Sequence, residues 1–270
     1  MRKILSPILL LVVFIAFTAC KPSTNGTNAQ ADEKLSKVEI EEKAEKVAFP
    51  LPDPLNTYRM LQDIGAIYNH DILNPISSVE KYFNSNLRAV NLGTYGADLS
   101  YTLVFDNSAD FDLYSKTLKK LVNDLNIDID YERLSKLNNK TDKELNDSAT
   151  QIATGLFYDI YEFLYRESDP SLSALMVNGF YIESLYIATH ISKETFNNIE
   201  IVKIIYQQRE ALNDLIELND RFVDNGYLQT INGSLMKLKL LYEATDGSLD
   251  KDQLDGITSI IEAIRDSIVS

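Results

Sequence analysis

One stretch of the sequence, residues 86–106, carries polar side chains at a spacing that could support binding or catalysis. Asn91, Tyr95 and Asp98 recur four and three residues apart, which places them on one face of a helix. The full polar stripe comprises Arg88, Asn91, Tyr95, Asp98 and Thr102. It predicts either a polar seam facing a pocket, with Asp98 as its charge, or the solvent face of an amphipathic helix, which is the commoner case.

A second stretch, residues 171–191, is apolar nearly all round and is typical of a buried central helix. Glu183 lies within it, and an unpaired buried carboxylate is energetically costly. We therefore expect Glu183 to pair with a basic residue, to hydrogen-bond with a tyrosine or asparagine, or to have a raised pKa. Such carboxylates belong to structural networks more often than to active sites. The candidate ligand-binding or polar-network residues are Asn91, Tyr95, Asp98, Glu183, Tyr186 and His190.

The motifs of common catalytic and metal centres are missing from the sequence. His70 and His190 are the only histidines, and His190 lies seven residues, about 10.5 Å along a helix, from Glu183. That separation prevents the two from coordinating one metal ion, and no HExxH or GxSxG motif occurs. We predict no catalytic residue, no metal ligand and no cofactor other than a covalent lipid. A glycosidase-type pair of carboxylates stays open, because 40 acidic residues offer many pairs.

The N-terminus has the organisation of a lipoprotein signal peptide. Arg2 and Lys3 precede a mostly apolar stretch, residues 4–17, that is shorter than the roughly 20 residues of a membrane-spanning helix. Residues 17–20 are FTAC, which resembles the lipobox of lipoprotein precursors. We expect cleavage before Cys20 and attachment of diacylglycerol to its thiol. An ordinary secretory signal with a chance cysteine is the alternative. Cys20 is the only cysteine, so no internal disulfide can form.

The composition divides the chain into three regions. Residues 1–19 are the predicted signal peptide, and residues 20–50 combine the lipidated cysteine with a polar and charged tether that cannot bury a core. Residues 51–270, which follow a proline-rich boundary, are predicted to form a single helical domain. Removing residues 1–19 removes two basic residues and no acidic ones, so the net charge changes from −14 to −16. This acidity argues against nucleic-acid binding.

The hydrophobic pattern beyond residue 51 is helical throughout. We expect an all-α protein, an antiparallel bundle or array of eight to ten helices packed in two layers. Thr141 and Glu144 form a predicted capping box, and Asp169-Pro170 is a predicted helix start. Gly96 lies in an apolar stripe, which favours the close approach of another helix there. The expected helices cover residues 55–68, 78–83, 86–106, 110–125, 171–191, 195–223 and 228–242, with others behind Thr141 and around residues 254–268.

Three segments stand out in the sequence: LNPISSVEKY from Leu73, NLGTYGADLSY from Asn91 and VNGFYIESLYIATHI from Val177. In this order they resemble a group of uncharacterised lipoproteins of Bacteroidota. The last two contain the patterns NLGxYGADLxY and GxxIExLYIAT. The resemblance covers about residues 51–191 and implies an exported helical protein, without a known activity or catalytic residue.

Three hypotheses about function follow from these features. The first is a periplasm-facing lipoprotein that acts as a non-catalytic interaction or scaffold module for another envelope protein. The second is a small-ligand-binding bundle, and the third is a hydrolase that uses Asp98 and Glu183. Because Lys21 follows Cys20 in place of an aspartate, and no acidic run follows it, we expect anchoring in the outer membrane, facing the periplasm.

Overall fold

The computed structural model of this chain describes residues 54–131, 144–192 and 195–270. These residues form eight α-helices and three short 3₁₀-helices and contain no strand, so the prediction of an all-α protein is confirmed. The predicted signal peptide, the tether and the expected cap at Thr141 lie outside the described residues.

The helices begin and end close to the positions that the hydrophobic pattern predicts, with three differences. The helix predicted for residues 55–68 ends at Asp63, the segment predicted for 78–83 is a 3₁₀-helix, and the helix predicted for 195–223 is divided. In order, the elements are α2 (Pro54–Asp63), η1 (His70–Ile72), η2 (Ile76–Lys81), α3 (Ser85–Val104), α4 (Ser108–Asp124), α6 (Glu144–Glu167), α7 (Pro170–His190), η3 (Thr195–Asn197), α8 (Ile199–Asn219), α9 (Gly226–Glu243) and α10 (Lys251–Val269).

Short polar residues determine where most helices begin and where two of them end. The side chains of Asn84 and Asn107 accept backbone N–H groups in the first turns of α3 and α4, which are the usual N-cap interactions. Asp106 and Asn126, at φ of 52° and 55°, adopt the left-handed conformation just after these helices. This conformation lets later N–H groups bond to the last carbonyls, and so it terminates the helices.

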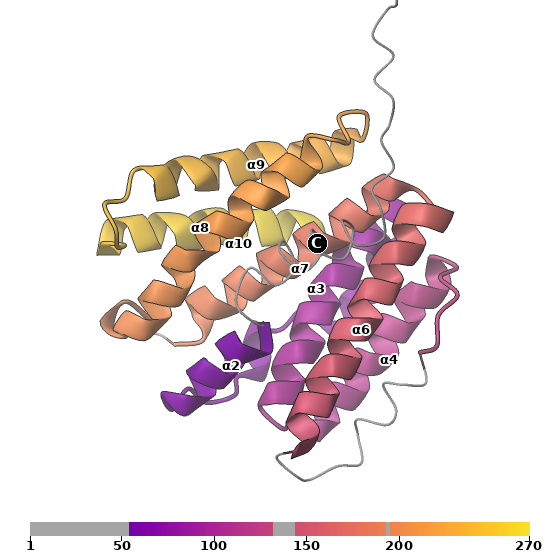
Figure 1. Cartoon of the computed structure of the whole chain (residues 1–270), viewed down its shortest axis with the longest axis horizontal. Coiled ribbons are helices and arrows are strands. Elements are labelled where there is room, and N and C mark those ends of the chain that lie inside the picture. Colours follow the sequence, from indigo (N-terminus) through magenta and orange to yellow (C-terminus); the bar gives the residue numbers. More distant parts are fainter. Residues whose placement is uncertain (1–53, 132–143, 193–194) are drawn as a thin grey trace, which may run out of the picture. The chain divides into compact units, whose positions relative to one another are not determined.

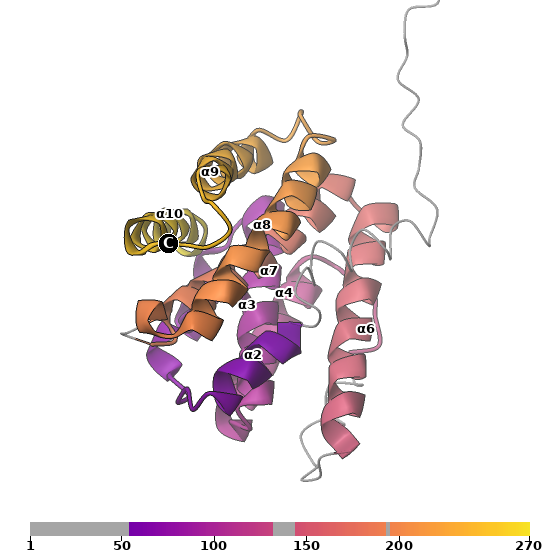
Figure 2. The same cartoon turned by 60° about the vertical axis from the view of Figure 1, so that its left-hand side comes forward.

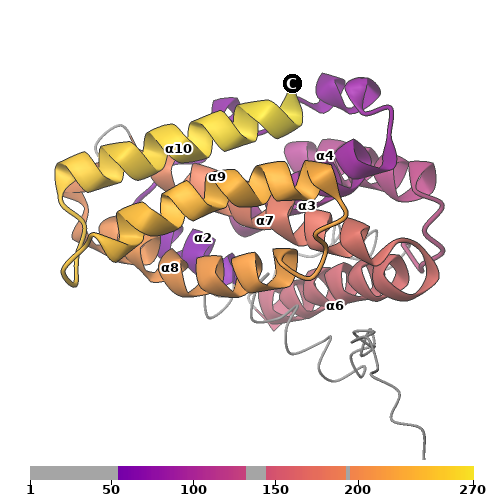
Figure 3. The ribbon, with the colours of Figure 1, turned by 90° about the horizontal axis from the view of Figure 1, so that it is seen from above.

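Helix α7 is the centre of the fold. It packs against α3 and α6 on one side and against α8 and α10 on the other. Figures 1 and 2 show α3, α4 and α6 grouped on one side of α7, while α9 and α10 lie on the opposite side. In Figure 3 the helices α8, α9 and α10 follow one another as neighbours. This position explains why the sequence of α7 is apolar nearly all round.

Helices α3 and α7 cross with their backbones in contact, at Gly93 and Gly179. A Cβ atom added to Gly93 would lie 1.8 Å from the Met176 carbonyl oxygen, and one added to Gly179 would lie 1.7 Å from the Val90 carbonyl oxygen. Only glycine fits at these two positions. Gly96, where the sequence favoured a close approach, has only ordinary contact, because its nearest neighbour is Phe180 Cδ2 at 3.7 Å.

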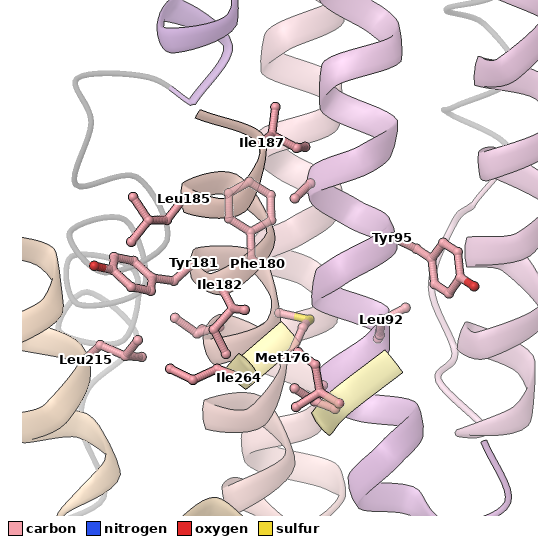
Figure 4. Packing of buried hydrophobic residues seen from close by; sticks show 14 of the residues in the cluster. Leu92, Tyr95, Met176, Phe180, Tyr181, Ile182, Leu185, Ile187, Leu215 and Ile264 are labelled. Atoms are coloured by element: carbon pink, nitrogen blue, oxygen red, sulfur yellow. The ribbon is translucent and has the colours of Figure 1, made fainter. Parts of the chain in front are cut away.

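The apolar core surrounds α7 on both sides. Figure 4 shows Met176 and Phe180 near α3, while Tyr181 and Leu215 lie on the side of α8. The Tyr181 hydroxyl donates to the Gln208 carbonyl of α8. Dense packing around both faces of one helix leaves no exposed side for its polar residues, so each of them must find a partner inside the protein.

Candidate functional site

The polar stripe of α3 is buried, so the interpretation of this stripe as a solvent face is wrong. Asn91, Tyr95, Asp98 and Thr102 are each 0% exposed. The Tyr95 hydroxyl donates to the Pro75 carbonyl at 2.8 Å, and Asn91 Nδ2 donates to the Ile268 carbonyl at 2.7 Å. The stripe therefore faces the segment around residue 75 and the end of α10, and its polar groups hold these elements against α3.

Glu183 pairs with Arg265, a residue of α10 that the sequence interpretation did not identify. Arg265 Nε donates to Glu183 Oε2 at 2.8 Å, and Nη2 donates to Oε1 at 2.9 Å. The Glu183 side chain is fully buried and that of Arg265 is 9% exposed. Arg265 Nη2 also lies 3.3 Å from the Ile72 carbonyl oxygen. This bidentate geometry is the strongest arrangement that an arginine and a carboxylate can form, and it confirms that Glu183 has a basic partner.

Asp98 and Glu183, from neighbouring helices, meet inside the protein. Beyond the Gly93–Gly179 crossing, α3 and α7 run in the same direction, which brings Asp98 beside Glu183, close enough for each carboxyl group to influence the pKa of the other. Asp98 Oδ2 also accepts the Asn74 backbone N–H at 3.2 Å. We call Asp98, Glu183 and Arg265 the ionic cluster. It joins α3, α7 and α10.

The electrostatics of the ionic cluster follow from burial and from the unequal number of charges. Burial raises the pKa of Asp98, and the neighbouring Glu183 carboxylate raises it further, well above its usual range. Burial also raises the pKa of Glu183, against the influence of Arg265. Burial lowers the pKa of Arg265, but Glu183 outweighs this effect and holds that pKa above its ordinary value, so the guanidinium stays charged.

Buried tyrosines surround the Asp98 side of the cluster. The Tyr114 hydroxyl donates to the Asn74 carbonyl at 2.8 Å, and Asn74 Nδ2 donates to the Tyr82 hydroxyl at 3.3 Å. Burial raises the pKa of Tyr58, Tyr95 and Tyr114 far above the value in water, so these hydroxyls remain neutral hydrogen-bonding groups. These tyrosines thus form an uncharged polar shell around the Asp98 side of the cluster, and Asn74-Pro75 belongs to this shell.

Tyr186 and His190 lie at the outer edge of the same cluster. The Arg265 guanidinium carbon is 4.0 Å from the centre of the Tyr186 ring, and the His190 ring stacks on Tyr186 at 3.9 Å between centroids. His190 Nε2 lies 2.8 Å from Glu262 Oε1, near the surface. Tyr186 therefore separates the buried guanidinium from the histidine, and a cation over a tyrosine face is a favourable contact.

The structure thus brings Asp98, Glu183 and Tyr186 together around Arg265, with Tyr95 among the surrounding tyrosines and His190 at the outer edge, and leaves Asn91 outside. The signal for Arg265 was present in the sequence. Arg265 follows Ile261 by four residues and precedes Ile268 by three, so it lies on the apolar stripe of its helix. A lone cation on an apolar stripe indicates a buried partner of opposite charge.

Sequence reasoning also missed a chain of buried amides on the α8 and α9 side of α7. Asn178 Nδ2 donates to Asn219 Oδ1 at 2.7 Å, and Asn219 Nδ2 donates back to Asn178 Oδ1 at 3.0 Å. Asn219 Nδ2 also lies 3.2 Å from Asn232 Oδ1, and Asn232 Nδ2 donates to Asp220 Oδ1 at 3.0 Å. These amides link α7, α8 and α9 and satisfy one another.

The fold and the cluster define an all-α protein whose central helix is held by a buried arginine–carboxylate cluster. Comparisons of the chain with protein-family models, with curated proteins and with solved structures found no match. Among the described residues, no group of three or more His, Cys, Asp or Glu side chains is arranged to hold a metal ion. None of the described helices has the length and hydropathy required to cross a membrane.

Proposed function

We propose that this protein is a lipid-anchored envelope protein that acts through non-catalytic contacts with a partner protein. One observation carries the proposal: the carboxyl groups best suited to bind a ligand are used inside the fold. Glu183 holds Arg265 with both oxygens, and Asp98 accepts the Asn74 N–H and lies beside Glu183. The sequence features that accompany this observation are the lipobox, the polar tether and the acidic charge.

The alternatives require the same carboxyl groups to do something else. A ligand-binding bundle or a hydrolase needs Asp98 and Glu183 to face a bound molecule. In the structure both are 0% exposed, and binding a molecule there would first have to break the bidentate pair with Arg265. Breaking a buried ion pair costs about 3–5 kcal/mol. We therefore place the functional contacts of the protein on its surface.

Partner capture tests the proposed function. The full lipoprotein, purified from detergent-solubilised membranes of its own host after mild cross-linking, is expected to bring down one envelope protein at constant stoichiometry. Repeated recovery of the protein alone would count against a scaffold role. A hydrolase activity lost in Glu183→Gln, in a variant shown by circular dichroism to be folded, would favour the enzyme instead.

Replacing Cys20 tests the proposed anchor. In Cys20→Ser the thiol that would carry the lipid is gone, so we expect the protein to move from the membrane fraction to the soluble periplasmic fraction. Stable anchoring takes two or more acyl chains, and a processed lipoprotein carries them on and beside this cysteine. Ser23→Ala, three residues away, is the matched control and should stay in the membrane. Fractionation with immunoblotting provides the measurement, and a Cys20→Ser variant that remains membrane-bound would contradict the anchor.

Digestion of the wild-type protein by protease added to intact cells would contradict the periplasmic orientation.

A further inference from the structure

We propose that Asp98 is held as an uncharged carboxylic acid that donates a hydrogen bond to Glu183, and that this single proton completes a pH-sensitive latch joining α3, α7 and α10. The proposal concerns the state of the ionic cluster and does not depend on the proposed function.

Only one of the two carboxyl oxygens of Asp98 accepts a hydrogen bond. Its Oδ2 atom accepts the Asn74 N–H, whereas no N–H or O–H group of the described residues donates to its Oδ1 atom. The carboxyl group of Glu183 lies within hydrogen-bonding range of Asp98. Ionised carboxylates only accept hydrogen bonds, so a hydrogen bond between the two needs a proton on one of them. The unsatisfied Oδ1 atom is where the proton belongs.

The charges of the ionic cluster balance only when one carboxyl group is protonated. Two carboxyl groups with 0% exposure face one guanidinium. Arg265 donates to both oxygens of Glu183, through Nε and Nη2, which favours the ionised form of that carboxylate and makes it an acceptor for Asp98. With the proton on Asp98 the cluster is neutral. Without it, one negative charge would be left buried and uncompensated, which is costly.

The groups that face Asp98 from the other elements are mostly uncharged. Tyr58 of α2, Tyr82 before α3, Tyr95 of α3 and Tyr114 of α4 supply phenol groups, all with raised pKa. None of these supplies a positive charge, and Arg265 of α10 is the cation that influences Asp98. The surroundings therefore do not compensate a second carboxylate.

The direction of the pH dependence follows from the raised pKa of Asp98. The stabilisation by a group of this kind is fully present below its pKa in the unfolded chain, about 3.9, and is lost as the pH rises toward the folded-state pKa. The tyrosines start to contribute only near pH 10, their pKa in the unfolded chain, because their folded-state values are also raised. A window from pH 5 to 9 therefore excludes the tyrosines.

Infrared spectroscopy of the full chain at pH 7.5 tests the proton directly. We expect the C=O band of a protonated carboxylic acid in the wild-type protein and its loss in Asp98→Asn, whose side chain cannot ionise. In Glu183→Gln the like charge is gone and Arg265 is free to pair with Asp98, so the band should also disappear as Asp98 ionises. An absent band in the wild type, or a band that persists in Asp98→Asn, would overturn the assignment. A band that persists in Glu183→Gln would show that Asp98 keeps its proton without Glu183, which would contradict the proposed bond between the two.

Denaturant unfolding at pH 5, 7 and 9 provides the second readout. The wild-type unfolding equilibrium constant is expected to increase by up to about tenfold per pH unit within the titration window, relative to Asp98→Asn at the same pH. Both proteins contain the same two histidines, so the difference between their profiles reports on Asp98. Parallel pH profiles of the two proteins would contradict the latch.

Discussion

Replacing Gly179 by alanine is expected to lower the free energy of unfolding by at least about 3 kcal/mol, at the upper end of the range for an overpacked interface. The added Cβ atom would lie 1.7 Å from the Val90 carbonyl oxygen. The obstacle is backbone, which cannot rotate away as a side chain can. The two helices must separate, and the packing around α7 loosens with them.

Gly96→Ala is the matched control, because it is a glycine of α3 near the same interface. Its added Cβ atom would meet only Phe180 Cδ2, at 3.7 Å. Alanine also favours the helix by up to about 1 kcal/mol, so this variant should be as stable as the wild type or slightly more stable. Urea denaturation followed by circular dichroism measures both changes. Equal stability of Gly179→Ala and Gly96→Ala would refute the close backbone crossing.

Replacing Arg265 by methionine is expected to cost about 3–5 kcal/mol of unfolding free energy, because Glu183 is then left as a buried charge without its partner. The effect should shrink when the carboxylate is removed as well. In the double variant Glu183→Leu/Arg265→Met an apolar pair replaces the ions, and such replacements are often neutral or stabilising. Recovery in the double variant separates the charge effect from a simple loss of packing.

Lys203→Met serves as the control for removing a cation. Lys203 pairs with Glu200 at 2.9 Å, but the two side chains are 58% and 44% exposed, and exposed pairs contribute less than about 1 kcal/mol. Thermal or urea unfolding at pH 7 compares the three proteins. If Arg265→Met costs no more than Lys203→Met, the ionic cluster has no structural role.

Much of the helical architecture could be predicted from the sequence because the helix signals are local. The pair Asp169-Pro170 predicts the start of α7, and the Asp169 side chain indeed accepts a backbone N–H there. The division between η3 and α8 was missed. Asn198 lies inside an apolar pattern that continues through it, yet its side chain caps α8 by accepting the N–H groups of Glu200 and Ile201.

The sequence does not predict which face of each helix is buried against which element, because this depends on partners distant in sequence. Gly93 and Gly96 are three residues apart and lie on nearly the same face of α3, so spacing alone does not choose between them. The polar stripe of α3 resembled a solvent face for the same reason. It is covered by residues near 75 and by the end of α10, and the sequence of α3 itself does not indicate these contacts.

The contacts between α10 and the first helices also determine the order in which the chain can fold. Arg265 bonds to the Ile72 carbonyl across 193 residues, and Asn91 bonds to the Ile268 carbonyl across 177. Contacts of such high sequence separation slow folding, because a long loop must close before they form. During synthesis, Asp98 and Glu183 emerge well before their guanidinium. We therefore expect the interior between α3 and α7 to stay incompletely packed until α10 arrives, so that α10 completes the core as the last step.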